Sequence, residues 1–88
     1  MSKAILTICN QRGLHARAAA KFVKLVSTFD SNVSVYKDGQ DVSGDSIMGL
    51  MMLAAAAGDK IAVSTSGLEA AAALQAITKL VENKFEEN

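Results

Sequence analysis

Apolar and polar residues alternate in several short stretches of the chain, which is the pattern of half-buried strands. In the first stretch, Ala4, Leu6 and Ile8 fall on one face and polar residues interrupt the other. The dipeptide Asp38-Gly39 is typical of a tight turn that joins two antiparallel strands. The stretches expected to form strands are residues 3–9, 33–36, 41–43 and 61–65.

Three other stretches carry apolar residues at helical spacing. The first helix is expected over residues 16–28, with Phe22 and Val26 on its apolar face. The second follows Ser46, which suits an N-cap, and Gly58 is expected to cap its C-terminal end. In the third, apolar residues from Leu74 to Val81 repeat on one face, and Phe85 flanks them.

The start and the end of the third helix can also be predicted. Ser66 and Glu69 have the spacing of a capping box, in which each side chain bonds the other residue's backbone N–H. The tail, residues 86–88, is expected to fray.

The elements follow the order strand, helix, strand, strand, helix, strand, helix. Its simplest solution is an α+β fold, an open-faced β-sandwich in which three helices cover one face of a four-stranded antiparallel sheet. The chain has 88 residues, half of them hydrophobic, so residues 1–88 are expected to form one domain with a real core.

Composition narrows the range of functions. Nine basic and nine acidic residues balance, so no global charge favours nucleic acid or an anionic membrane as a partner. The single cysteine, Cys9, cannot form an internal disulfide, and its apolar surroundings predict a buried structural residue. The first apolar stretch is too short for a signal peptide or a membrane span, so we expect a cytoplasmic protein.

The only histidine, His15, stands at the predicted start of the first helix, two residues after Gly13. Helix N-termini attract anions, because their first N–H groups lack internal acceptors and the helix dipole is positive there. Arg17 adds a planar fork of donors that suits a phosphate group. A neutral imidazole is a nucleophile, so these residues suggest phosphohistidine, although lone histidines are more often structural.

The second helix is apolar on every side and cannot bury all of its residues. Leu50 and Leu53 can face the core, whereas Ile47, Met48 and Met51 would form an exposed patch suited to docking several partners. Methionines tucked into the core are the alternative, and for Met52 a core position is the expectation.

The first helix has a basic stripe opposite its apolar face. The stripe contains Arg17, Lys21, Lys24 and Thr28, and it begins at the proposed phosphate site. It is either an ordinary solvated face or, with Lys24 as a contact, a docking edge for acidic partner surfaces.

Three motifs together resemble the histidine-containing phosphocarrier protein (HPr) family over nearly the whole chain. They are Gly13-Leu14-His15-Ala16-Arg17, Ser46-Ile47-Met48-Gly49 and Ala57-Gly58. One departure is plain: the family usually has a proline directly after the arginine, whereas this chain has Ala18 and no proline at all.

The resemblance implies a function for the chain. His15 would accept a phosphoryl group from enzyme I, which obtains it from phosphoenolpyruvate, and would pass it to IIA-type proteins. Arg17 would contact the phosphate. Ser46 would be the target of a dedicated serine kinase/phosphorylase, as in many members. The resemblance implies no cofactor and a monomer that is a carrier and not an enzyme in its own right.

Two other function classes compete with this one. In an acylphosphatase-like hydrolase, Arg17 would hold a substrate phosphate, but no second acid or base lies near His15 in the sequence to activate water. A regulatory binding module controlled through Ser46 is the other. A metal site is not expected, because one histidine and one cysteine offer no ligand cluster. Whether the chain serves a sugar-transport or a nitrogen-related branch depends on its partners.

Overall fold

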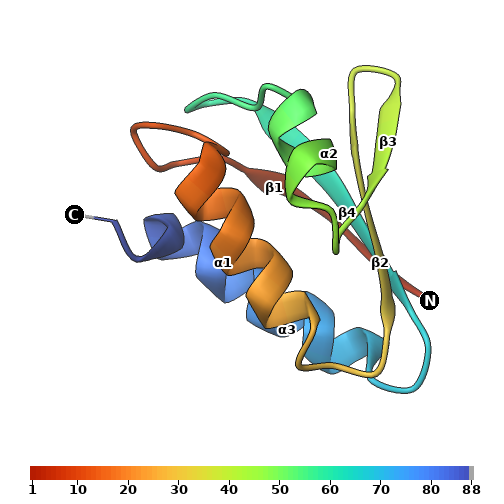
Figure 1. Ribbon diagram of the computed structural model, residues 1–88. Helices are drawn as coiled ribbons and strands as arrows, with labels where there is room; N and C mark the ends of the chain where they lie inside the picture. The colour runs from red at the N-terminus through yellow and green to blue at the C-terminus, as the bar shows by residue number, and fades with distance from the viewer. Residues whose placement is uncertain (88) are drawn as a thin grey trace.

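The computed structural model describes residues 1–87 and has the predicted order of elements (Figure 1). A single turn, η1, follows the last helix. The elements are β1 (Ser2–Thr7), α1 (Ala16–Val26), β2 (Asn32–Lys37), β3 (Gln40–Ser43), α2 (Ile47–Met52), β4 (Lys60–Ser66), α3 (Ala70–Glu82) and η1 (Lys84–Glu86).

The four strands form one antiparallel sheet in the order β1-β4-β2-β3. In this register Ala62 of β4 lies between Ile5 of β1 and Tyr36 of β2, on the face that stays exposed. The opposite face carries the buried strand residues, and the three helices lie against it (Figure 1). The predicted open-faced sandwich is therefore confirmed.

The core lies between this sheet face and the helices. Phe22 of α1, Leu50 of α2 and Ile77 of α3 are fully buried with Val63 of β4. Burying side chains of this size stabilises the fold by roughly 1.5–3 kcal/mol each. The residues predicted to face inward on α1 and α3 do so, because a single apolar stripe on each helix can pack only against the sheet.

The second helix is shorter than predicted. It ends at Met52, and Ala54 then adopts a positive φ of 52°. Gly58 is not its C-terminal cap. It lies in the loop that leads to β4, where its N–H donates a hydrogen bond to the carbonyl of Ile8. The prediction of a buried Met52 was also wrong, since this side chain is 66% exposed.

The prediction of a capping box at the start of α3 is wrong as well. Glu69 is itself the N-cap residue and makes no side-chain cap hydrogen bond. Its carboxylate instead accepts a hydrogen bond from the Asp30 N–H at 2.7 Å, while its own N–H donates to the Asp30 carbonyl. The hydrogen bonds between Glu69 and Asp30 thus take the place of the predicted ones between Glu69 and Ser66.

The predictions of a buried Cys9 and of a fraying tail are corrected. Cys9 is exposed, because β1 ends at Thr7 and the residue turns away from the core, with its thiol near the Val81 carbonyl at 3.2 Å. The tail does not fray at Glu86, which belongs to the η1 turn, or at Glu87, which follows it. Asn88 lies outside the described residues. Within residues 1–87, no helix has the length and apolar character needed to cross a membrane.

Candidate functional site

The loop between β1 and α1 carries His15 and is fixed to the loop that precedes β4. The Leu14 N–H donates to the Ala55 carbonyl at 2.9 Å, and the Ile8 N–H donates to the Asp59 carbonyl at 2.8 Å. Gly13 has a φ of +67°, and a Cβ there would lie within 2.9 Å of Ala56 Cα and nearer still to the Ala55 carbonyl oxygen. Only glycine allows the two loops to approach so closely.

His15 is the N-cap residue of α1. Its backbone is extended, and its carbonyl accepts the first helical hydrogen bond, from the Ala19 N–H at 2.8 Å. Among the described residues, 1–87, no side chain caps this end of the helix, so the N–H groups of residues 16–18 remain available to an anion. The sequence prediction of a histidine at the start of a helix is confirmed.

The imidazole of His15 contacts the carboxylate of Glu87, which comes from the far end of the chain. His15 Nε2 bonds Glu87 Oε2, and the second carboxylate oxygen accepts a hydrogen bond from Asn10 Nδ2 at 3.2 Å. Asn10 is fully buried, and the same amide group also donates to the Gly13 carbonyl at 2.7 Å. The site loop and the tail are thus joined through one asparagine.

The pKa of Glu87 lies below its ordinary value. The hydrogen bond from His15 is the largest cause, and the hydrogen bond from Asn10 and the charge of Arg12 act in the same direction. An ionised carboxylate can only accept hydrogen bonds, so the proton between the two groups resides on His15 Nε2.

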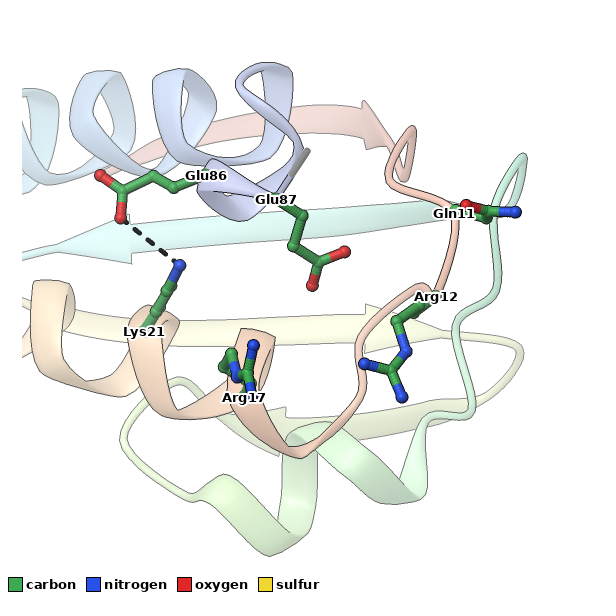
Figure 2. Close-up of a pocket in the computed structure, with 6 residues that line it drawn as sticks. All are labelled: Gln11, Arg12, Arg17, Lys21, Glu86 and Glu87. Atoms are coloured by element: carbon green, nitrogen blue, oxygen red, sulfur yellow. Dashed lines mark ion pairs between the residues drawn. The ribbon is translucent and has the colours of Figure 1, made fainter.

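A polar cleft lies beside the pair and is drawn in Figure 2. The basic side chains of Arg12, Arg17 and Lys21 line it together with Glu86 and Glu87. Glu87 projects toward the two guanidinium groups, whereas Lys21 lies at the other end, 3.6 Å from Glu86 (Figure 2). Both guanidinium groups are exposed and can turn toward an incoming anion.

Lys21 is bound to the tail and is not part of a uniform solvated stripe. Its ammonium group donates to the Phe85 carbonyl at 2.8 Å, and the side chain is about one-third exposed. Arg17 and Lys24 are exposed on α1, and Thr28 is exposed just beyond its C-terminal end. The stripe therefore divides into a part that holds the tail and a part that is free to meet a partner.

The patch predicted on α2 is exposed. Met48 is 70% exposed, Ile47 and Met51 about 40%, and Met52 joins them. We call these four residues the α2 patch. The helix α2 packs against α1, and Figure 1 shows it close to the end of α1 that His15 caps. Leu50 and Leu53 are buried, as predicted.

Ser46 is the N-cap of α2, as the sequence predicts. Its Oγ accepts a hydrogen bond from the Gly49 N–H at 3.0 Å, and the residue is partly exposed beside Asp45. Within residues 1–87, no group of three histidine, cysteine, aspartate or glutamate side chains gathers where it could hold a metal ion.

Sequence reasoning missed Glu87, Asn10 and Arg12. Glu87 is 72 positions from His15, and no local pattern predicts that the tail returns to the site. Asn10 and Arg12 lie in the loop before the histidine, where a turn role explains them equally well. No local pattern in the sequence singles out Asn10, because its burial is evident only from the fold.

We expect acid to release the tail from the site. Because the folded pKa of Glu87 is lowered, its charge favours the docked tail above pH 4.5, its ordinary value, and this contribution is lost as pH falls through the folded pKa. The side-chain amide resonances of Asn10, followed from about pH 6 to about pH 2, should therefore shift in acid. The same resonances in Glu87→Gln should not follow this titration. An identical titration in both proteins would contradict the contact.

Comparison with known proteins supplies the family. The family model described as "PTS HPr component phosphorylation site" matches residues 2–83. The chain is 48% identical over 87 residues to the phosphocarrier protein HPr of Neisseria meningitidis serogroup A, covering 99% of this chain and 98% of that protein. It is 44% identical over 82 residues to the phosphocarrier protein NPr of Shewanella violacea, covering 93% and 90%.

The fold agrees with a solved structure of the same kind. The crystal structure of HPr from Thermoanaerobacter tengcongensis superposes with a TM-score of 0.95 at 40% identity and covers 100% of this chain and 99% of that one. Sequence and fold therefore lead to the same assignment. The chain belongs to the HPr family, the phosphocarrier proteins that relay phosphoryl groups within the phosphotransferase system.

Proposed function

We propose that His15 is the residue that carries the phosphoryl group, receiving it from enzyme I and passing it to IIA-type acceptors. The observation that supports this most directly is the position of His15 at the uncapped N-terminus of α1, beside a cleft lined by Arg12, Arg17 and Lys21. A phosphoryl group on the ring would be near free backbone N–H groups and the guanidinium groups of Arg12 and Arg17. These groups favour an anion.

The transfer requires a ring nitrogen with a free lone pair. That nitrogen attacks the phosphorus of the donor, a nitrogen–phosphorus bond forms, and the bond to the donor breaks with its electron pair left on the donor. In the second transfer, an atom of the acceptor attacks the same phosphorus, and the nitrogen–phosphorus bond breaks with its electron pair left on the ring nitrogen. Because the first transfer puts a phosphoryl group on the chain and the second removes it, the chain is a carrier in a relay and not an enzyme that completes a turnover.

Arg17 has the role of a phosphate contact. Its guanidinium group can bond two phosphate oxygens at once, which a lysine ammonium group cannot do in the same fixed geometry. Arg17 is exposed and lines the cleft beside His15, so it can reach both the incoming and the bound phosphoryl group.

The α2 patch is the docking surface for both partners. It is apolar, exposed and rich in methionine, whose flexible side chain fits differently shaped surfaces. Lys24 adds a positive charge on α1 that would attract acidic partner surfaces and raise the encounter rate. We propose that the monomer presents this same surface first to enzyme I and then to the acceptor.

Ser46 is the proposed regulatory site, modified by a serine kinase/phosphorylase. A phosphate there adds about −1.5 to −2 charges at the edge of the α2 patch. The N-cap position tolerates that charge, because the first N–H groups of a helix accept anions. The penalty falls on partner binding, where the new charge must be desolvated next to Ile47 and Met48.

We expect His15→Ala to abolish phosphoryl acceptance without loss of the fold, because the nucleophile is removed from a partly exposed position. Arg17→Lys should slow transfer by about ten-fold, the effect of losing one charge-assisted hydrogen bond. Labelling by phosphoenolpyruvate and enzyme I measures both. Wild-type labelling of His15→Ala, or steady release of phosphate from acyl phosphates by the wild type, would contradict the carrier role of His15.

Met48→Asp should weaken binding to enzyme I and to the acceptor, because it introduces a charge into an apolar interface. The melting temperature should change little, since the side chain is 70% exposed. Leu68→Asp is the matched control: Leu68 is 90% exposed and lies in the loop before α3, away from the α2 patch. Equal loss of binding in the two variants would show that docking does not depend on the α2 patch.

Ser46→Asp should fold normally and accept phosphate on His15 more slowly, chiefly through weaker binding to enzyme I. Ser46→Asn separates charge from shape, because asparagine is an equally good N-cap but is neutral. The rate of phosphorylation, measured against the concentration of each protein, decides between them. If the two variants have the same dependence, charge at Ser46 does not regulate docking.

A further inference from the structure

The loop that follows α2 ends in a tight turn, residues 56–59, which contacts the site loop between β1 and α1. We call it the 56–59 turn. The Gly58 N–H in this turn donates to the Ile8 carbonyl, at the beginning of the site loop, at 2.7 Å. Nearer the histidine, a Cβ on Gly13 would lie only 2.9 Å from the Ala56 Cα. The position of the 56–59 turn therefore limits where the site loop can lie.

The carboxylate of Asp59 closes this turn. Its Oδ2 accepts a hydrogen bond from the Ala56 N–H at 2.9 Å, and the Asp59 N–H donates to the Ala56 carbonyl at 2.9 Å. Aspartate side chains often stabilise turns in this way, by bonding backbone groups a few residues away. Because Ala55 accepts the hydrogen bond from the Leu14 N–H, a shift of Ala56 is passed on to the residue before His15.

Lys37, the last residue of β2, reaches the same carboxylate from the hairpin that joins β2 to β3. Its ammonium group donates to Asp38 Oδ2 at 2.9 Å and lies 3.7 Å from Asp59 Oδ2. The Lys37 side chain is only 14% exposed, whereas that of Asp38 is 83% exposed. The hydrogen bond with Asp38 raises the pKa of Lys37 against the opposing effect of burial, so the ammonium group keeps its charge.

A single cation thus bridges two carboxylates that belong to separate turns. Its removal would do more than delete an attraction, because Asp38 and Asp59 would then repel each other across the space that it leaves. The hairpin and the 56–59 turn would move apart. Surface ion pairs contribute little to the stability of a whole domain, so we expect the consequence to be local to the turn.

We propose that Lys37 is a positioning residue for phosphoryl transfer: through Asp59 it holds the 56–59 turn against the site loop, and so fixes the helix start at which His15 reacts. The proposal rests on His15 being the phosphoryl carrier. Among the residues that the structure describes, Lys37 does not line the cleft beside the imidazole. Its effect should therefore appear in the rate of the transfer step and not in the binding of partners to the α2 patch.

Lys37→Met and Lys37→Arg test the proposal in the full-length protein. The rate of His15 phosphorylation by phospho-enzyme I is measured against the concentration of each variant. We expect Lys37→Met to lower the maximal rate by about three-fold, the effect of losing a partly exposed ion pair, with little change in the half-saturating concentration. Lys37→Arg keeps the cation and should react as the wild type does.

Two further variants separate the ion pair from a general loss of charge. Lys60→Met is the matched control, because Lys60 is exposed next to Asp59 but makes no ion pair within residues 1–87, and it should react at the wild-type rate. Asp59→Asn, added to Lys37→Met, removes the repulsion while the amide oxygen can still accept the Ala56 N–H, so the double variant should recover most of the lost rate. Equal slowing in Lys37→Met and Lys60→Met would overturn the proposal.

Amide hydrogen exchange follows the site loop independently of activity. In Lys37→Met, the Leu14 N–H that bonds Ala55 should exchange faster, while the N–H of Val63 within the sheet keeps its wild-type rate. Faster exchange of both, with a lower melting temperature, would show that Lys37 supports the whole fold. No change at Leu14 would show that Lys37 does not hold the loop. Either result would overturn the proposal.

The two measurements also distinguish this proposal from the function on which it rests. A wild-type protein that takes no phosphate on His15 in the presence of active enzyme I would refute the carrier role, and with it the role of Lys37 in transfer. Normal labelling of the wild type, together with a Lys37→Met variant that reacts equally fast, would refute the positioning role alone.

Discussion

The site depends on one close approach between two loops. The loop before α1 runs so near the loop after α2 that Gly13 has no room for a side chain, and the Leu14 N–H bonds the Ala55 carbonyl. This contact fixes where α1 begins and therefore where His15 lies. It also brings the start of α1 close to the α2 patch, so that a partner bound as we propose would have the imidazole within reach.

The sheet and its core make that approach possible. With the helices on one face and the other face bare, β1 and β4 are neighbours, and the loops at their ends lie side by side. The proposed nucleophile, His15, lies at a helix end, and the proposed docking surface, the α2 patch, lies on a second helix. Partner binding and chemistry can thus be changed separately, which is what regulation through Ser46 would require.

Much of this fold could be predicted from the sequence, because period-two and helical patterns reflect burial against one sheet face. His15 was correctly placed at the start of a helix and Ser46 as an N-cap, since a helix start has local signals such as the preceding glycine and the serine itself. The exposed face of α2 followed from its excess of apolar residues. Met52 did not, because a helix of only six residues does not bury it.

The remaining features depend on contacts between distant parts of the chain. Glu69 bonds Asp30 and not Ser66, and Glu87 returns to His15 after a turn with left-handed backbone. Neither pairing has a local signature, and charged residues at a chain end ordinarily indicate fraying. The position of His15 at the start of a helix was predictable, but the carboxylate that contacts it was not.

The carrier role of His15 is the central claim, and direct detection of the phosphorylated residue tests it most directly. After incubation of ¹⁵N-labelled protein with phosphoenolpyruvate and enzyme I, we predict one acid-labile, base-stable phosphoryl group, with phosphorus coupled to a ring nitrogen of His15. Phosphate on any other residue, or no bound phosphate in the presence of active enzyme I, would contradict the account.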